Sequence, residues 1–427
     1  MSEVWEPERL GKICYIKARI GWRGLSSAEY TEDGPFLIAG QHIKDGLIAW
    51  DNCDHISEQR FLESHEIILR SGDVIITKDG TIGRVARVDK LPGDATINGT
   101  MMLVRPLRRL DYRFLYHVLN GRGFQKLIDD KVSGSSIPHL FQRDMVELEV
   151  ALPSMEKQGK IAKVLDTLDA SIRGTEAVVA KLRAMKQGLL HDLLTRGIDA
   201  NGDLRPPQLE APQLYHHTPL GWLPKEWEVV SLSKVSTKIT DGTHQAVETV
   251  ADMDGTHPFL YVSCVRDGVI HWDKAARVNE RHYVEISKGR EPDVGMILYT
   301  AVGSYGHSAV VESDFPFAFQ RHIACIFPDN RSVEPTFISE YLNSDGGRRH
   351  ADRVAIGNAQ KTVTLGELSR FPVPLPCIEE QVRIAVALKA ATRSQKQEIE
   401  VLDKLRLQKS GLMDDLLTGR VPVTPLL

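Results

Sequence analysis

The sequence of 427 residues has few cysteines, no long apolar run and no excess of charge of one sign. Its five cysteines are widely spaced and form no Cys-x-x-Cys pair, which argues against a disulfide framework or a zinc ribbon and favours the reducing cytoplasm. No apolar stretch reaches the length of about 18 residues that a membrane span needs, and we expect no signal peptide. The formal net charge of −4 provides no global basic field, so any footprint for nucleic acid is a local patch.

The sequence also lacks the common motifs of catalysis. It contains no Gly-x-x-x-x-Gly-Lys-Ser/Thr phosphate loop, no Gly-x-Gly-x-x-Gly, no His-Glu-x-x-His and no Gly-x-Ser-x-Gly. A DNA methyltransferase needs an Asn/Asp-Pro-Pro-aromatic segment, but the only Pro-Pro pair here is Pro206-Pro207, preceded by an arginine. The Pro-Asp pairs at 292–293 and 328–329 are not followed by the Glu/Asp-x-Lys of a nuclease. We therefore predict a non-catalytic chain that binds no cofactor and no metal.

The most informative feature is a long internal repeat. Shifted by 222 or 223 residues, the sequence aligns with itself: Trp5-Glu6 matches Trp227-Glu228, Asp45-Gly46 matches Asp267-Gly268, and residues 188–195 match residues 411–418. The period is too long for a solenoid, so it indicates one module of roughly 200 residues that occurs twice. The segments between the matches are dissimilar, which predicts two divergent binding surfaces on one scaffold.

The first part of each module combines short apolar runs with helical stretches. Runs typical of strands occur at 73–77, 101–105, 295–299 and 322–326, and segments with glycine, aspartate and proline separate them. A helical stretch follows in each module, at 112–130 and at 335–349. These patterns predict a compact α+β domain in each module.

The second part of each module predicts a single long helix. Residues 154–196 contain no proline, and apolar residues recur at nearly heptad spacing: Ile161, Leu165, Leu168, Ile172, Val179, Leu182, Leu189 and Leu193. The copy at 377–418 keeps Ile384, Leu388, Leu402, Leu405, Leu412 and Leu416. A helix of about 40 residues is roughly 60 Å long, too long for its own domain to cover. We therefore expect the two helices to pair and bury their apolar stripes against each other.

Polar loops provide the candidate ligand contacts. Asparagine and glutamine read adenine bidentately, whereas serine, lysine and arginine hold phosphates. Taken singly, each loop is explained more simply as a hairpin turn or a solvated loop. The candidates lie on the turn at 78–84 and its copy, on the loops before each long helix, after residue 241 and beside two strands: Lys78, Thr81, Arg84, Ser304, Tyr305, His307, Ser133, Ser135, Ser136, His139, Asn358, Gln360, Lys361, Thr243, His244, Asn98 and Gln320.

Together these features resemble the specificity subunit of type I restriction–modification enzymes. The resemblance rests on Leu-Pro-x-x-Glu-x-Gln at 152–158 and 375–381, which opens each long helix, and on Gly-Leu-Leu/Met-x-Asp-Leu-Leu-Thr, which closes it. The segments Pro-Leu-Gly-Trp-Leu-Pro-Lys-Glu-Trp at 219–227 and Asp-Gly-Thr-His at 241–244 are similar to that family as well. The duplicated helix signatures are specific, and the resemblance covers nearly the whole chain.

The resemblance implies a tandem duplication of an α/β target-recognition domain plus a long helix, within the α+β class, with the helices paired as an antiparallel coiled coil. The expected segments are the recognition domains 1–152 and 227–375, the spacer helices 153–197 and 376–420, and a proline-rich connector at 198–226 that is extended and adds nothing to a core.

The family's function is likewise implied. Each domain would read one half of a split, asymmetric site in double-stranded DNA, and the helices would set the gap and dock two modification subunits. Those methyltransferase subunits bind S-adenosylmethionine and methylate adenine, and motor–nuclease restriction subunits, with ATP and Mg²⁺, complete the complex. Two alternatives stay open: a coiled-coil scaffold for proteins without DNA readout, and a self-contained DNA-modifying enzyme.

Overall fold

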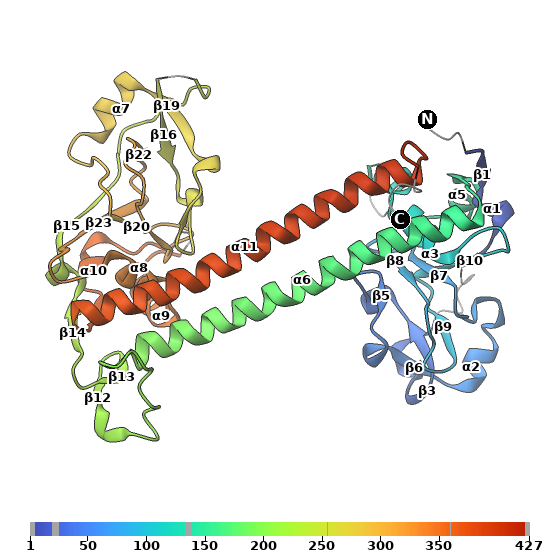
Figure 1. Ribbon diagram of the computed structural model, residues 1–427, viewed down its shortest axis with the longest axis horizontal. Helices are drawn as coiled ribbons and strands as arrows, with labels where there is room; N and C mark the ends of the chain where they lie inside the picture. The colour runs from blue at the N-terminus through green and yellow to red at the C-terminus, as the bar shows by residue number, and fades with distance from the viewer. Residues whose placement is uncertain (1–4, 19–24, 134–137, 254, 359, 423–427) are drawn as a thin grey trace. The chain divides into compact units, whose positions relative to one another are not determined.

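The computed structural model describes residues 5–18, 25–133, 138–253, 255–358 and 360–422. The chain divides into two compact units (Figure 1). Unit 1 consists of Met1–Ala177 with Ile399–Leu427, and unit 2 of Val178–Glu398. Each unit contains one α+β domain together with part of each long helix, so the five segment bounds expected from the sequence stay predictions.

The domain of unit 1 is built on two small sheets. In the first, β2 (Cys14–Ala18), β10 (Met101–Pro106), β7 (Val74–Thr77) and β8 (Val85–Arg87) are antiparallel neighbours in that order. In the second, β3 (Tyr30–Ile38) lies between β6 (Asp54–Ile56) and β9 (Ala95–Ile97). The shorter elements are β1 (Pro7–Arg9), α1 (Leu10–Ile13), β4 (Ile43–Lys44), β5 (Leu47–Ile48), α2 (Glu58–Leu62), α3 (Tyr112–Val118), α4 (Arg122–Ser133), α5 (Gln142–Glu147) and β11 (Glu149–Ala151).

The domain of unit 2 repeats this topology. Its four-stranded sheet has the order β15 (Ser236–Asp241), β23 (Ile323–Pro328), β20 (Ile297–Thr300) and β21 (Ser308–Val310). Its three-stranded sheet places β16 (Thr256–Leu260) between β19 (Ala276–Asn279) and β22 (Ala318–Phe319), with α7 (Glu280–Ser287) against it (Figure 1). The other elements are β14 (Glu228–Ser231), β17 (Val265–Arg266), β18 (Val269–Ile270), α8 (Pro335–Asn343), α9 (Asp345–Val354), α10 (Leu365–Ser369) and β24 (Pro372–Leu375). The duplication read from the sequence is therefore a duplication of fold.

The expected strands are present, but each expected helical stretch is two helices. In unit 1 the stretch breaks at Asn120 and Gly121, between α3 and α4. In unit 2 it breaks at Ser344, whose hydroxyl accepts a hydrogen bond from the amide of Gly347 and so caps a new helix, α9. The sequence prediction missed these breaks because capping residues inside a continuous apolar pattern are a weak signal.

The two long helices are continuous and they pair. Helix α6 spans Met155–Thr195 and helix α11 spans Ile378–Leu417, 41 and 40 residues, each roughly 60 Å long. In unit 1, Lys409 Nζ lies 2.5 Å from Asp169 Oδ1, and Arg406 Nη2 lies 2.7 Å from Glu176 Oε1. Partner numbers fall along α11 as they rise along α6, so the pairing is antiparallel.

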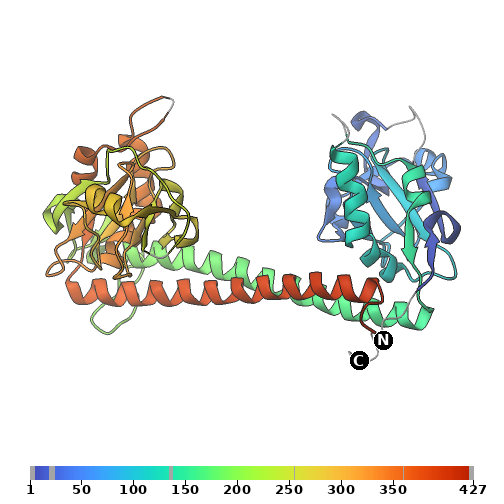
Figure 2. The same ribbon diagram turned by 90° about the horizontal axis from the view of Figure 1, so that it is seen from above.

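In each unit, residues of the predicted apolar seam from both helices belong to one core cluster. In unit 1, Ile161 and Leu165 of α6 share one core cluster with Met413 and Leu416 of α11. In unit 2, Leu193 of α6 shares a core cluster with residues of α11 that include Ile384 and Leu388. Within each unit the two helix segments lie side by side in both views (Figures 1 and 2). The antiparallel coiled coil is confirmed.

The glutamine of the repeated Leu-Pro-x-x-Glu-x-Gln segment ties each domain to its helix. Gln158 is fully buried; its Oε1 accepts a hydrogen bond from the Asp111 amide, and its Nε2 donates to the carbonyls of Arg109 and Pro153. The matching Gln381 does the same, with the Glu334 amide and the carbonyls of Ser332 and Pro376 as partners. The motif is therefore a structural clamp at the start of each long helix.

The proline-rich connector is not the extended, coreless segment that the sequence suggested. It contains a hairpin of β12 (Tyr215–Thr218) and β13 (Gly221–Pro224), and Ile198 and Leu223 join the core of unit 2. A two-stranded hairpin tolerates proline because each strand has a free edge that needs no amide donor. None of the described helices is both long enough and apolar enough to cross a membrane.

Candidate functional site

The glycine-containing segments singled out in the sequence are tight turns between antiparallel strands. Gly80 and Gly83 in the turn between β7 and β8 have φ angles of 72° and 82°, and Gly303 and Gly306 between β20 and β21 have 75° and 87°. The Gly83 amide donates to the Thr77 carbonyl, and the Gly306 amide to the Thr300 carbonyl. The simpler interpretation as turns is therefore correct, and any ligand contact comes from the polar side chains that these turns present.

Unit 1 brings several of the predicted residues to one place. The carboxylate of Asp79 binds both Lys78, at 2.5 Å, and the ring of His139. The turn is also held by the Thr100 carbonyl, which accepts from the Lys78 amide, while Asn98 Oδ1 accepts from the hydroxyl of Thr100 at 2.7 Å.

Of the remaining candidates of unit 1, two are exposed on the turn and the side chains of the others lie outside the part that the structure describes. Thr81 and Arg84 are exposed on the turn, and Arg84 Nη1 reaches the carbonyl of Gly40 at 3.5 Å. Ser135 and Ser136 lie outside the described residues, and so does the side chain of Ser133. The base-reading and phosphate-binding roles given to these residues stay predictions.

Unit 2 has a cavity of about 550 Å³ at the equivalent turn. It brings together three of the predicted residues, Ser304, Gln320 and Gln360. The other lining residues are Val262, Ser263, Arg266, Lys274, Val302, Gly303 and His322. Among the described residues, the lining thus combines two cations with amide and hydroxyl groups and includes no carboxylate, which suits a polyanion that presents hydrogen-bonding edges.

Sequence reasoning missed three polar residues of this cavity: Ser263, Arg266 and Lys274. A signal for one of them was available, because the shift of 222 residues aligns Arg266 with Lys44 and so conserves a positive charge between the modules. The others gave no signal, because only the fold brings their separate loops together.

Two other candidates of unit 2 hold the structure together. Thr243 is buried, and its amide and carbonyl bond to the Phe319 carbonyl and the Arg321 amide. His307 is buried against Asp267, whose carboxylate lies 2.9 Å from its Nδ1, and burial lowers the pKa of this histidine. Neither side chain lines the cavity.

The rest of the unit 2 candidates lie around the cavity rather than in it. Tyr305 donates to Asp352 at 2.6 Å, and the exposed His244 binds Asp241 at 2.8 Å. Asn358 and Lys361 are exposed on the loop before α10, where the Lys361 carbonyl accepts from the Gly303 amide. Their contacts with DNA stay predictions.

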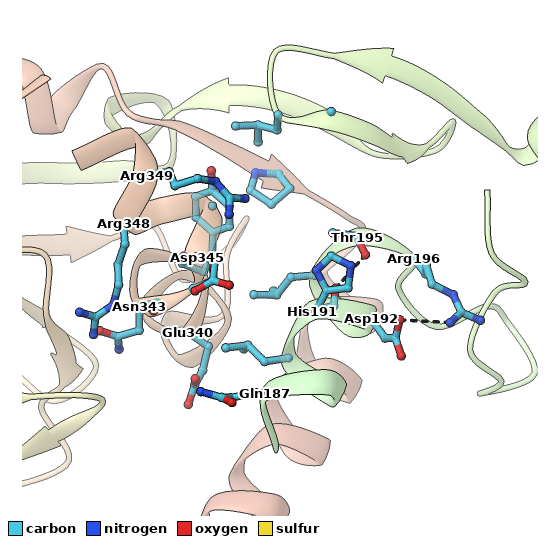
Figure 3. Close-up of a pocket in the computed structure, with 18 of the residues that line it drawn as sticks. Gln187, His191, Asp192, Thr195, Arg196, Glu340, Asn343, Asp345, Arg348 and Arg349 are labelled. Atoms are coloured by element: carbon cyan, nitrogen blue, oxygen red, sulfur yellow. Dashed lines mark hydrogen bonds and ion pairs between the residues drawn. The ribbon is translucent and has the colours of Figure 1, made fainter. Parts of the chain in front are cut away.

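A larger cavity of unit 2, about 1720 Å³, differs in its charge (Figure 3). It lies among the end of α6, the β12–β13 hairpin and helices α8 and α9, and its arginines are interspersed with Asp192, Asp267, Glu340, Asp345 and Asp352. Figure 3 shows Glu340 beside Gln187, and burial raises the pKa of this carboxyl group. Mixed charge makes this cavity a poorer match for a polyanion than the smaller one. Among the described residues, no cluster of histidine, cysteine and carboxylate side chains is suited to a metal ion.

Comparison with known proteins identifies the family. A family model for the type I restriction modification DNA specificity domain matches the chain twice, over residues 2–183 and 224–404. The chain belongs to this family. Each match covers one domain and most of the long helix that follows it, so the resemblance read from the helix signatures is confirmed.

Related specificity subunits match over most of the chain. The type I restriction enzyme MjaVIII specificity subunit of Methanocaldococcus jannaschii is 22% identical, and the alignment covers 100% of this chain and 95% of that relative. The EcoBI specificity subunit of Escherichia coli is 28% identical over 64% of this chain and 57% of its own length. This chain is thus a type I specificity subunit, whose role is recognition of a DNA target.

Solved structures show the same fold. The S subunit of a type I restriction–modification system from M. genitalium is 15% identical, with a TM-score of 0.60 over 97% of this chain and 96% of that one. A chain solved in work on complex assembly and conformational transition of the type I system is 19% identical, with a TM-score of 0.51 over 98% of both. The fold of a specificity subunit is therefore shared despite low sequence identity.

Proposed function

We propose that this specificity subunit reads a bipartite, asymmetric site in double-stranded DNA, with domain 1–152 reading one half and domain 227–375 the other. The supporting observation is one sheet topology present twice, with different polar side chains on the equivalent turns. The first turn carries Lys78, Thr81 and Arg84, whereas the second turn carries Ser304 and Tyr305. Two domains that share a fold but present different polar side chains can bind two different DNA half-sites.

The paired helices α6 and α11 would set the gap between the halves and dock two methyltransferase subunits. Half-sites read from one face of DNA are about 34 Å apart for each helical turn, and each helix has roughly 60 Å of length. The subunit would bind DNA weakly alone, because its net charge of −4 provides little neutralisation of phosphates. Its partners would supply the remaining contacts.

In this proposal the subunit itself is not catalytic and binds no cofactor. The methyltransferase subunits would hold S-adenosylmethionine and modify adenine, and motor–nuclease restriction subunits would use ATP and Mg²⁺. Support comes from the missing catalytic motifs and from the role of the related subunits as parts of restriction enzymes. Methyl transfer by the purified chain without any partner would contradict this assignment.

Exchange of one domain tests the half-site assignment. Residues 1–152 are replaced by the corresponding domain of another specificity subunit, and the chimera is assembled with the methyltransferase subunits. Methylated adenines are then mapped across a genome. We expect one half of the recognised sequence to change and the other half to stay. A change in both halves would refute the assignment, and a wild-type complex that selects no split motif from random DNA would favour the protein scaffold instead.

A further inference from the structure

One surface segment recurs in both domains and is absent from the candidates that the sequence suggested. In unit 1 it is the 3-10 turn η2 (Gly40–His42) followed by the β4–β5 hairpin. In unit 2 it is the 3-10 turn η7 (Val262–Cys264) followed by the β17–β18 hairpin. We call these the η2 segment (40–44) and the η7 segment (262–266).

Buried and exposed residues alternate in the same way in both segments. In the η7 segment, exposed Ser263 and Arg266 flank Cys264 and Val265, which are fully buried. The His271 amide donates to the Cys264 carbonyl at 2.7 Å and fixes the turn. The exposed side chains are therefore presented by a rigid backbone, which sequence-specific reading requires.

The η2 segment repeats this pattern with different exposed residues. Gln41 and Lys44 are exposed and flank the buried His42 and Ile43. The Ala39 amide donates to His42 Nδ1, and the Ala49 amide to the His42 carbonyl. The backbone pattern is thus shared between the domains while the surface chemistry is not.

Both segments lie against the glycine turns already described. In unit 2, Ser263 and Arg266 line the cavity of about 550 Å³ together with Gln320 and Gln360. In unit 1, Arg84 Nη1 donates to the Gly40 carbonyl at 3.5 Å, which joins the η2 segment to the 78–84 turn. The segments are therefore parts of the same surface as the predicted DNA contacts.

Arg266 is available for a ligand although an aspartate follows it. Asp267 adopts a positive φ of 46° in the hairpin turn, and its carboxylate is held by His307 and by Arg348, at 2.9 and 2.5 Å. Within the described part of the chain, Arg266 forms no ion pair. Arg266 lines the larger cavity as well, but in the smaller one the described lining residues include no carboxylate that would compete for its guanidinium.

We propose that these segments determine sequence specificity: Gln41 and Lys44 in the first domain, Ser263 and Arg266 in the second. Arg266 reads a guanine in the half-site of the second domain, because a guanidinium fork on a rigid segment binds O6 and N7 of guanine bidentately. Lys44, at the equivalent position, contacts the other half-site. The proposal rests on the proposed function, since it requires each domain to read its own half.

The test uses the complete complex with its methyltransferase subunits and a DNA library randomised across both half-sites. Methylation of each sequence is counted for the wild type, for Arg266→Gln and for Lys44→Gln. Arg266→Gln should lower discrimination at one base pair of one half-site by about 5- to 150-fold and leave the other half unchanged. Lys44→Gln should alter only the opposite half. Arg281→Gln is the matched control, because Arg281 is exposed on α7 outside the cavity.

Each alternative result overturns the proposal. If Arg266→Gln weakens methylation equally for all sequences and makes it less sensitive to salt, Arg266 contacts a phosphate and reads no base. If Arg266→Gln behaves like Arg281→Gln, the η7 segment lies outside the DNA interface. In either case, a domain exchange that still changes one half-site leaves the proposed function standing. A domain exchange that changes both half-sites would refute the assignment of one half-site to each domain.

Discussion

The buried glutamine at the start of each long helix leads to a quantitative prediction. Replacing Gln158 by leucine keeps the side-chain volume nearly constant but removes three hydrogen bonds. Their lengths are 2.8 Å from the Asp111 amide, 3.0 Å to the Arg109 carbonyl and 2.8 Å to the Pro153 carbonyl. Gln158 is fully buried, so water cannot replace these partners without a local opening of the structure.

The expected loss of stability follows from the three backbone groups left without a partner. An unsatisfied buried polar group costs about 1–3 kcal/mol, and small backbone shifts make the three costs less than additive. We expect Gln158→Leu to destabilise unit 1 by about 3–6 kcal/mol. Since folded domains are stable by only about 5–15 kcal/mol, unit 1 should become marginal.

Hydrogen exchange followed by mass spectrometry on the full chain resolves the two units. Gln158→Leu should lower protection in peptides covering β10 and the start of α6, and Gln381→Leu should lower it in β23 and the start of α11. Gln187→Leu is the control, because Gln187 is exposed on α6. The clamp model is refuted if Gln158→Leu and the control agree within about 1 kcal/mol, or if each clamp variant destabilises both units equally.

Three further predictions concern other parts of the chain. Glu380→Ala should cost about 3–5 kcal/mol in urea unfolding, because it removes the carboxylate 2.5 Å from Arg205, which is only 11% exposed and keeps just the longer contact with Glu226 at 3.9 Å. Glu379→Ala on the surface should cost under about 0.5 kcal/mol. Burial lowers the pKa of His117 below its ordinary value of 6.5, so the unfolded chain binds more protons than the folded chain at this pH. Thermal melts should therefore show that unit 1 loses stability as the pH falls below about 6.5. A stability that does not change with pH in this range would contradict the prediction. Inserting one heptad into 165–185 and another into α11 should lengthen the DNA spacer by about 10 Å, or roughly three base pairs. Methylation mapping should then find both half-sites unchanged. A changed half-site would contradict the spacer role.

The sequence predicted the parts of this structure that depend on repetition and periodicity. The heptad-like spacing from Ile161 to Leu193 predicted a helix at 154–196, and the structure has α6 at Met155–Thr195. A period of apolar residues is a strong signal because each turn of a helix adds to it. The prediction of an extended connector was wrong, because Tyr215 and Leu223 are buried in a hairpin that no periodic pattern of apolar residues predicts.

The candidate site was predicted less well, because its residues come from segments far apart in the chain. The sequence suggested Ser304, Gln320 and Gln360 from three separate loops, and the fold places all three around one cavity. It also suggested His307, which the fold buries against Asp267, and it passed over Arg266. A residue's type shows which bonds it can form, but not whether its side chain faces solvent.

By itself, the sequence determined the duplicated architecture, the paired long helices and the family, because order, register and period are properties of a linear chain. The tertiary structure decided which polar residues share a surface and which are structural. It also showed that Gln158 and Gln381 each tie a domain to its long helix. These distinctions depend on burial and on distances between remote segments, which are fixed only when the chain folds.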